Sequence, residues 1–461
     1  MSTQKGHVAR LLVVAASWLV SLGVGTAAAQ TLPPLRHEKY TLANGLEVIL
    51  HQDTSVPLVS VNVWYKVGSG DEQPGRTGFA HLFEHVMFMG SQNVPVGQFD
   101  VWLESAGARN NGTTDEDRTL YYEDLPSNAL ALALWLEADR MGWLLPTMDQ
   151  EKLDIQRGVV QNERRQGVDN VPYGRAYETI VAALFPKDHP YSWDVIGSLA
   201  DLSAASLDDV QGFFRKYYAP NNASIAIAGD FAMDEAKALV NRFFSAIPRG
   251  PAIDRRASVP APAITRDTFL VLEDHVQLPR VYYTWPSVKI YGAGDAERDV
   301  LAYVLAGDKT SRLYKRLVYE LQVAQDVEAF QSGHRMDGLF QISVTPKPGQ
   351  QPETLARLVN EEMQKIARAG ITAGELERAQ SRFLSQFLDG LASVNGKAFQ
   401  LNHYNYFVGN PDWVRQDAAR YSRVTAADVQ RAAAEQFAKP KVVLTVVPQG
   451  QTQLMVKGGA Q

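Results

Sequence analysis

The chain contains no cysteine among its 461 residues. This absence excludes a thiol nucleophile, thiolate metal ligands, disulfide bonds and a lipid-modified N-terminal cysteine. An exported protein without disulfides fits a bacterial periplasm, where free thiols risk oxidation.

The chain also lacks a basic block, and its formal net charge is −6 at pH 7. A mildly acidic protein of this kind is a poor candidate for binding nucleic acid. With 45% hydrophobic and 21% charged residues, the composition is that of a soluble globular protein with an ample core. The length predicts about two to three domains.

Only one run is long and apolar, and it lies at the N-terminus. Lys5 and Arg10 precede the apolar stretch Leu11–Val24, and Ala27–Ala29 follows it. This order predicts a secretory signal peptide at residues 1–29. A retained membrane anchor is the alternative, although the stretch is short and small residues follow it. We therefore expect a periplasmic or secreted protein without membrane attachment after processing.

Similar segments recur in the two halves of the chain. Ser206–Gln211 and Thr425–Gln430 each begin with a good N-cap residue. Each leads into a strand-like run, at Ala223–Gly229 and Val442–Val447. The recurrence predicts two similar α+β domains, each of which opens with strands, carries helices, and closes with a helix and a strand.

A cluster of prolines separates the two halves. Pro248, Pro251, Pro260 and Pro262 interrupt any regular element there. After the signal peptide, the predicted division is therefore an N-terminal domain at 30–248, a linker at 249–266, a C-terminal domain at 267–450 and a tail at 451–461.

The most informative motif is His81-Leu82-Phe83-Glu84-His85. Residues four apart lie on one face of a helix, so the two imidazoles can bind one zinc ion. With a third protein ligand, zinc keeps one position for water and lowers the pKa of that water to about 7. Glu84 stands beside the second histidine in the H-x-x-E-H order and could accept the water's proton as general base.

The alternative is that the two histidines are hydrogen-bonded core residues. Apart from His81, Glu84 and His85, every residue in Phe79–Met89 is apolar, so the helix should be buried nearly all round. Three ionisable groups in such surroundings are costly unless a metal satisfies them. The second half has no counterpart of the histidine pair, which predicts one metal site per chain.

A third ligand is expected on a predicted helix at residues 149–166. Gln156 and Glu163 fall on one face of that helix, and Glu163 is the only carboxylate there. Its neighbours Arg164 and Arg165 leave open a second interpretation, in which Glu163 belongs to an ordinary surface salt bridge.

These motifs resemble those of the pitrilysin/insulinase family of zinc peptidases, the inverzincins. The chain is similar to the short bacterial members that resemble mitochondrial processing peptidase. The matching stretches are Gly78–His85, Asn110–Thr114, Arg118–Tyr122, Val159–Arg165, His189–Tyr191 and Tyr217–Asn222. The resemblance implies two homologous α/β-roll domains and an endopeptidase that cleaves peptides or unfolded segments in an enclosed chamber.

The resemblance also implies roles for particular residues. The family places its third zinc ligand at the position of Glu163, so His81, His85 and Glu163 would hold the zinc ion. The substrate would pair with an edge strand beside the zinc, which corresponds to the stretch containing Asn111 and Thr114. An ordinary polar turn is the alternative for that stretch.

Two departures from the family pattern stand out. Many members carry a glutamate where this chain has Gln156, which can hydrogen-bond near the ligands but carries no charge. Active members also need an arginine and a tyrosine in the C-terminal domain, and these places are Val318 and Gln325 here. Arg316 and Tyr319 lie nearby at the wrong spacing.

This combination resembles the catalytic subunit of a heterodimer, whose homologous partner lacks the zinc motif and supplies the arginine and tyrosine. We therefore expect an exported zinc endopeptidase subunit with Glu84 as its base. Two alternatives remain at this point: a non-catalytic structural or assembly subunit that retains the fold, and a self-sufficient homodimeric peptidase.

Overall fold

The computed structural model describes residues 32–255, 259 and 264–458. The predicted signal peptide lies outside this range. Across the described residues, every helix is too short or too polar to cross a bilayer.

The N-terminal half is built on a six-stranded sheet whose order is β1-β2-β6-β3-β5-β4. Neighbouring strands are antiparallel except β2 and β6, which are parallel. Strand β4 pairs only with β5, so one edge of β4 is unpaired within the described chain. The strands are β1 (Glu38–Thr41), β2 (Glu47–Gln52), β3 (Leu58–Tyr65), β4 (Arg109–Thr114), β5 (Thr119–Pro126) and β6 (Ala223–Gly229).

The C-terminal half repeats this arrangement in a five-stranded sheet ordered β7-β11-β8-β10-β9. Its strands are β7 (Thr268–Asp274), β8 (Arg280–Ser287), β9 (Ala324–Gly333), β10 (Gly338–Pro346) and β11 (Val442–Pro448). Ser206 and Thr425 each cap the helix that precedes the last strand of their half, through the same reciprocal bonds. The predicted pair of similar α+β domains is confirmed.

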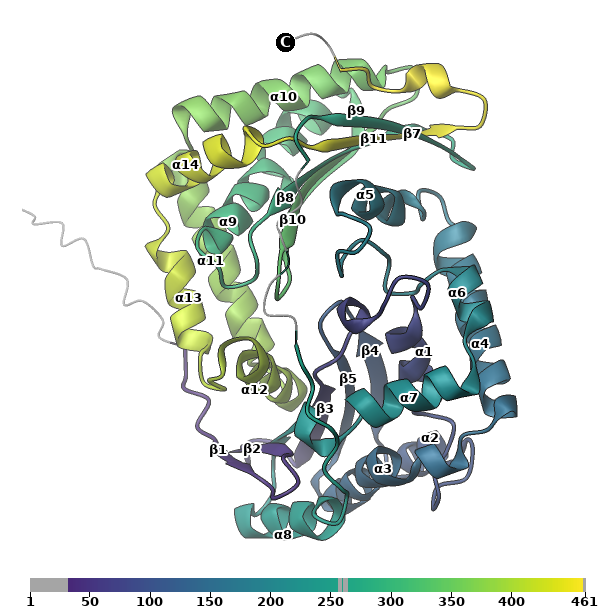
Figure 1. Ribbon diagram of the computed structural model, residues 1–461. Helices are drawn as coiled ribbons and strands as arrows, with labels where there is room; N and C mark the ends of the chain where they lie inside the picture. Colours follow the sequence, from purple (N-terminus) through teal and green to yellow (C-terminus); the bar gives the residue numbers. More distant parts are fainter. Residues whose placement is uncertain (1–31, 256–258, 260–263, 459–461) are drawn as a thin grey trace, which may run out of the picture.

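Helices cover the sheets as Figure 1 shows. The N-terminal half contains α1 (Phe79–Val86), α2 (Gln98–Ser105), α3 (Leu130–Trp143), α4 (Gln150–Arg164), α5 (Ala176–Leu184), α6 (Leu199–Ala204), α7 (Leu207–Tyr217) and α8 (Met233–Phe244). The C-terminal half contains α9 (Asp295–Ala306), α10 (Pro352–Ala369), α11 (Ala373–Gly390), α12 (Val394–Val408), α13 (Val414–Arg423) and α14 (Ala426–Phe437). Short π-helical segments lie at Arg165–Asp169 and Tyr314–Glu320. Single 3₁₀ turns lie at Ser69–Asp71, Ser127–Ala129, Leu145–Thr147, Pro220–Asn222 and Thr452–Leu454.

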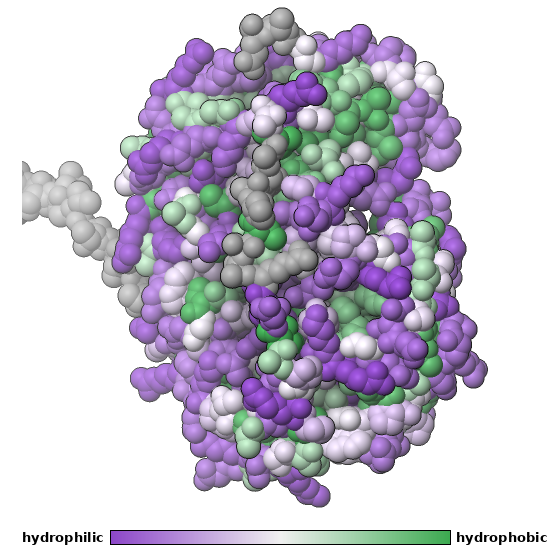
Figure 2. All heavy atoms as spheres, viewed as in Figure 1, coloured by the Kyte–Doolittle hydropathy of each residue, from purple (hydrophilic) through white to green (hydrophobic). Residues whose placement is uncertain are grey.

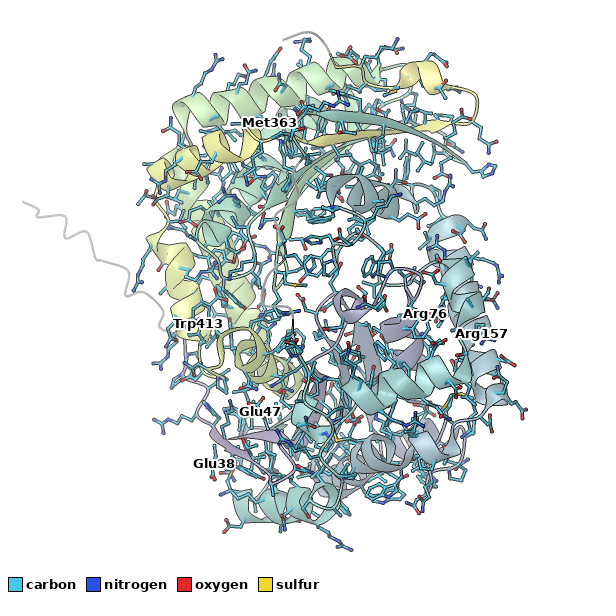
Figure 3. The ribbon with its side chains drawn as sticks, viewed as in Figure 1. Glu38, Glu47, Arg76, Arg157, Met363 and Trp413 are labelled. Atoms are coloured by element: carbon cyan, nitrogen blue, oxygen red, sulfur yellow. The ribbon has the colours of Figure 1, made fainter. Side chains whose placement is uncertain are left out.

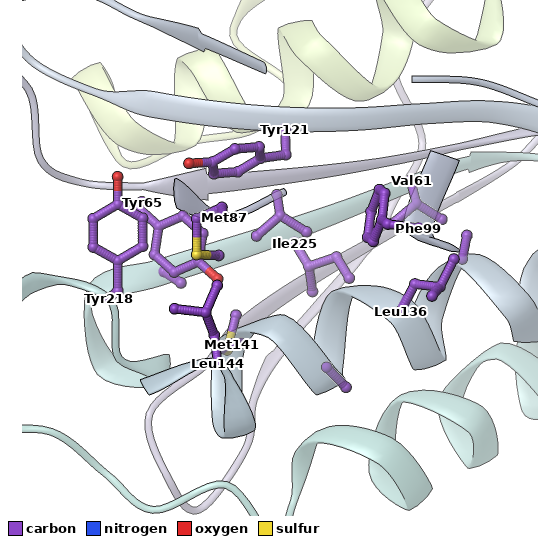
Figure 4. Packing of buried hydrophobic residues seen from close by; sticks show 14 of the residues in the cluster. Val61, Tyr65, Met87, Phe99, Tyr121, Leu136, Met141, Leu144, Tyr218 and Ile225 are labelled. Atoms are coloured by element: carbon purple, nitrogen blue, oxygen red, sulfur yellow. The ribbon is translucent and has the colours of Figure 1, made fainter. Parts of the chain in front are cut away.

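The main core lies between the N-terminal sheet and its helices. Side chains of alternate strand residues, such as Val61 and Ile225, meet Leu136 and Met141 of α3 (Figure 4). Val86 of α1 is buried in the same cluster, so the helix that carries the histidine pair is fixed to the sheet by its apolar face.

Each half contributes one helix that packs on the sheet of the other half, and we call these two the exchanged helices. Helix α12 of the C-terminal half packs on β3 and β6 of the N-terminal sheet, and α5 of the N-terminal half packs on β8 and β11 (Figure 1). Strand β6 permits this approach because Ala226 and Ala228 turn their small side chains toward the α12 cluster. Separating the halves would expose both of these apolar contacts to water.

Asn402 of α12 offers a test of the exchange. Its buried side-chain amide donates to the backbone oxygen of Asn62 (2.7 Å) and accepts from Ser224 Oγ (2.8 Å). Asn402→Ala leaves these groups unpaired, so we expect a loss of about 1–3 kcal/mol in the free energy of unfolding, measured with urea. The exposed Asn241→Ala on α8 is the control and should change it by less than about 0.5 kcal/mol. Equal effects of the two variants would contradict a stabilising role for the exchanged helix.

Candidate metal centre and active site

Helix α1 begins at a glycine and is capped from outside. Gly78, at the N-cap, has φ 86°, a left-handed conformation that favours glycine. The carboxylate of Glu72 accepts hydrogen bonds from the backbone N–H groups of Gly78 (3.0 Å) and Ala80 (2.7 Å). These bonds satisfy free N–H groups of the first turn, while burial raises the pKa of the Glu72 carboxyl well above its usual range.

The predicted helix through the H-x-x-E-H motif is confirmed, and its motif residues share one face. Ligand-type atoms of His81, Glu84 and His85 lie within 4.8 Å of one another. Burial, with His85 as a lesser cause, lowers the pKa of His81 to about 4. The His81 imidazole is therefore neutral near pH 7, which is the form that binds a metal ion.

Glu163 reaches the same place from α4. Its Oε2 atom lies 3.1 Å from His85 Nε2 and 3.7 Å from His81 Nε2. Tetrahedral zinc with bonds of about 2.0–2.2 Å holds its ligand atoms roughly 3.3–3.6 Å apart. The two imidazoles and the carboxylate therefore fit a zinc ion in both chemistry and spacing.

The two arginines that follow Glu163 have other partners. Arg164 pairs with Glu178 (2.8 Å), and Arg165 donates to Asn162 (2.9 Å). These contacts do not support the interpretation of Glu163 as part of a salt bridge with its own neighbours. It remains half-exposed and faces the histidines.

Helix α4 is tethered so that Glu163 stays opposite α1. Asp149 caps its first turn by accepting from Lys152 N. Arg157, which is labelled in Figure 3, donates to the backbone oxygens of Leu202 (3.0 Å) and Ala205 (2.5 Å). The helix is thus bonded to the C-terminal end of α6 and to the residue that follows it.

Glu84 is held by strand β4. Thr114 Oγ1 donates to Glu84 Oε2 at 2.6 Å, and burial raises the pKa of Glu84. Gly112 allows the close approach, because a Cβ atom at its position would lie 3.0 Å from Glu84 Cγ and 3.2 Å from the Tyr121 ring. The carboxylate therefore has a fixed position next to the candidate ligands.

The stretch containing Asn111 and Thr114 is an edge strand, so the alternative of a polar turn is wrong. Asn111 is exposed, and its side chain accepts from Gly112 N (2.9 Å). The hydroxyl group of Thr114, a residue that sequence analysis assigned to substrate binding, donates to Glu84. The amide nitrogen of Gln156 contacts Met89 Sδ, just after α1, at 2.7 Å.

Arg316 and Tyr319, the two nearby candidates in the described part of the C-terminal half, do not stand at the positions of Val318 and Gln325. Val318 packs against the C-terminal core, and Gln325 is exposed at the start of β9. Arg316 is paired with Glu361 (2.5 Å) and Glu362 (2.6 Å) of α10. Tyr319, 76% exposed, points away from the packed core.

Two residues that sequence analysis missed support the site. Glu72 caps α1, and Asp117 is buried in the turn after β4, where groups from both halves of the chain contact it. The available signals were an acid ahead of a helix that begins at glycine and the acidic run Asp115–Asp117. Neither signal reveals which N–H or hydroxyl groups the carboxylates accept from.

Comparison with known families agrees with this geometry. The family model described as Insulinase (Peptidase family M16) matches residues 47–189, and the model described as Peptidase M16 inactive domain matches residues 204–383. The chain belongs to the peptidase M16, or insulinase, family.

Relatives cover nearly the whole chain. A zinc protease PqqE from Helicobacter pylori is 29% identical over 445 residues, which is 93% of this chain and 96% of the relative. The uncharacterized zinc protease YmxG from Bacillus subtilis is 22% identical, with 90% of this chain and 98% of the relative covered.

Solved structures show the same fold. A protease from Helicobacter pylori superposes with a TM-score of 0.82 at 25% identity, covering 90% of this chain and all of the other. The periplasmic protease PqqL from Escherichia coli gives 0.75 at 20% identity, covering 93% of this chain but 49% of the other. The fold of this chain therefore corresponds to about half of that longer protein.

Metal content tests the candidate ligands. We expect about one zinc ion per chain in purified protein and little in His81→Ala or Glu163→Gln, because two remaining ligands bind zinc weakly. The measurement is zinc by mass spectrometry after dialysis. His275→Ala, an exposed histidine of the C-terminal half, is the control and should retain the metal. Full zinc occupancy in His81→Ala and Glu163→Gln would remove these residues from the ligand set.

Proposed function

We propose that the protein is a zinc-dependent endopeptidase and the zinc-bearing subunit of a heterodimer. The observation that carries this proposal is the contact of Glu163 with both histidines, beside a carboxylate fixed by Thr114. Membership in a peptidase family supports the same chemistry.

In this proposal His81, His85 and Glu163 hold the zinc ion, and Glu84 does not coordinate it. Zinc supplies a Lewis acid that polarises the scissile carbonyl and promotes ionisation of water. Glu84 accepts a proton from the attacking water and later delivers it to the leaving amine. Thr114 keeps the Glu84 carboxylate oriented for both transfers, because its hydroxyl occupies Oε2 and leaves Oε1 available.

The substrate is proposed to bind as an extended strand along β4. The unpaired edge of β4 offers backbone N–H and C=O groups to an extended peptide, with Asn111 on the same strand. Such pairing selects peptides or unfolded segments, because a folded domain rarely presents a free extended backbone. Thr114 takes part through its backbone, since its hydroxyl serves Glu84.

A homologous partner is proposed to supply the missing arginine and tyrosine. Arg316 cannot replace the arginine while it is paired with Glu361 and Glu362, and Val318 has no donor. The fold of this chain matches about half of PqqL, which is consistent with a second, similar half as partner.

The proposal also includes export and a two-domain division. Residues 1–29 would be removed as a signal peptide, which would place the mature protein in the periplasm or outside the cell. The chain would divide into domains at 30–248 and 267–450, joined by the linker at 249–266, with α5 and α12 exchanged across that boundary.

The role of Glu84 is tested by Glu84→Gln in the zinc-loaded protein with its partner. We expect zinc content and unfolding temperature to stay unchanged while the turnover number falls at least a hundredfold, which is about the scale of general-base catalysis. The readout is hydrolysis of an unstructured fluorogenic peptide. Glu104→Gln, an exposed glutamate on α2, serves as the matched control and should keep full activity. Near-normal turnover of Glu84→Gln would refute the assignment of the base.

The need for a partner is tested by titration. The chain alone should bind zinc yet cleave the peptide poorly, because Val318 and Gln325 cannot stabilise developing negative charge as arginine does. Adding a homologous chain that carries the pair should restore turnover and saturate near a 1:1 ratio. If full activity is present without partner and unchanged on addition, the chain is a self-sufficient peptidase and the heterodimer is rejected.

A further inference from the structure

We propose that the C-terminal half positions the general base and the zinc-binding helix of the same chain through the turn between β4 and β5. In this proposal Asp117 is a positioning residue. The inference rests on the proposed role of Glu84, and it assigns to the C-terminal half a task in catalysis that needs no contact with substrate.

Asp117 receives hydrogen bonds from both halves of the molecule. It is only 2% exposed, and its carboxylate accepts from Tyr191 Oη (2.6 Å) and from the backbone N–H of Arg335 (2.7 Å). Its backbone oxygen accepts from Tyr406 Oη of α12 at 3.0 Å. Three hydrogen bonds, from Tyr191, from Arg335 and from Tyr406, therefore hold the turn after β4.

The neighbouring acid is bound in the same way. Glu116 accepts from Tyr177 Oη of α5 (2.9 Å) and lies 3.4 Å from His334 Nδ1. His334 and Arg335 both belong to the turn between β9 and β10, in the C-terminal half. Two buried carboxylates on one short turn would be costly without these donors, so the turn cannot keep this conformation alone.

The turn is connected to the base, Glu84, through strand β4. Strand β4 enters the turn directly after Thr114, whose hydroxyl holds Glu84. A displacement of the turn therefore displaces the donor that orients the carboxylate. Catalytic groups are sensitive to such shifts, since a misplacement of about 1 Å can cost roughly a hundredfold in rate.

The turn is also connected to α1, through the loop that contains Ser69, Gly70 and Glu72. The backbone oxygens of Asp115 and Glu116 accept from the N–H groups of Ser69 (3.1 Å) and Gly70 (2.8 Å). The fit is close, because a Cβ atom on Gly70 would lie 2.7 Å from the Glu116 oxygen. This loop continues to Glu72, the carboxylate that caps α1. The C-terminal half thus reaches both the base and the helix of the histidines through hydrogen bonds.

The experiment uses the zinc-loaded full chain with its partner and compares Asp117→Ala, Asp117→Asn and Tyr191→Phe. Asparagine can accept from Arg335 N–H and donate to Tyr191, so it should restore most of the function. We expect kcat to fall at least about tenfold in Asp117→Ala and Tyr191→Phe, with KM within about twofold and zinc content unchanged. Asp412→Ala is the matched control, because it removes the bond from Leu35 N to the Asp412 carboxylate (3.0 Å), a contact between the halves that does not involve this turn or α12.

A second readout does not depend on activity. Hydrogen exchange of the chain without partner should be faster in β4 and in the first turn of α1 for Asp117→Ala, and unchanged there for Asp412→Ala. Normal kcat and normal exchange in Asp117→Ala would overturn the inference, as would an equal loss of kcat in Asp412→Ala. If the wild-type complex fails to cleave any peptide, the proposed function is rejected, and the exchange data alone decide whether the turn couples the halves.

Discussion

The structure depends on satisfying the ionisable groups that α1 carries into a half-buried position. His81 and His85 would be unfavourable on such a helix without a metal ion or a hydrogen-bond partner. The Glu163 carboxylate of α4 lies 3.7 Å from His81 Nε2 and 3.1 Å from His85 Nε2. The contact joins two helices that are far apart in sequence. Three contacts hold α1, α4 and β4 in position around this site: the Glu72 cap, the hydrogen bonds of Arg157 and the close fit at Gly112.

The two halves of the chain act as one body. Their sheets share one strand order, and one helix of each half, α5 or α12, packs on the sheet of the other half. The face in Figure 2 is mostly hydrophilic and indented on the right between the halves. Hydrophobic burial under α5 and α12 holds the halves together, and the polar contacts at Asp117 and Asn402 fix their relative position. A domain without a metal motif can therefore contribute to the order of a metal site that it does not contain.

Sequence patterns with short spacing predicted the helices that carry the candidate site residues. The helix through His81 and His85, the helix that carries Glu163 and the repeat capped by Ser206 and Thr425 are all present, because periodicity and caps act within one or two turns of chain. The edge position of Asn111 came from resemblance, since a short polar stretch has no periodicity that separates strand from turn. The bond from the Thr114 hydroxyl to Glu84 could not be predicted because it depends on how closely β4 approaches α1.

The sequence by itself determined which chemical groups are available: two histidines and a glutamate at helical spacing, no thiols, and valine and glutamine at positions 318 and 325. It also determined that the chain folds as two similar α+β halves, because hydrophobic periodicity and helix caps are local properties. Only the tertiary structure decided that Glu163 meets the histidines, that α5 and α12 cross between the sheets, and that Asp117 joins the halves beside the base. These contacts link residues far apart in the chain, and their geometry follows from the packing of whole elements, which no local pattern encodes.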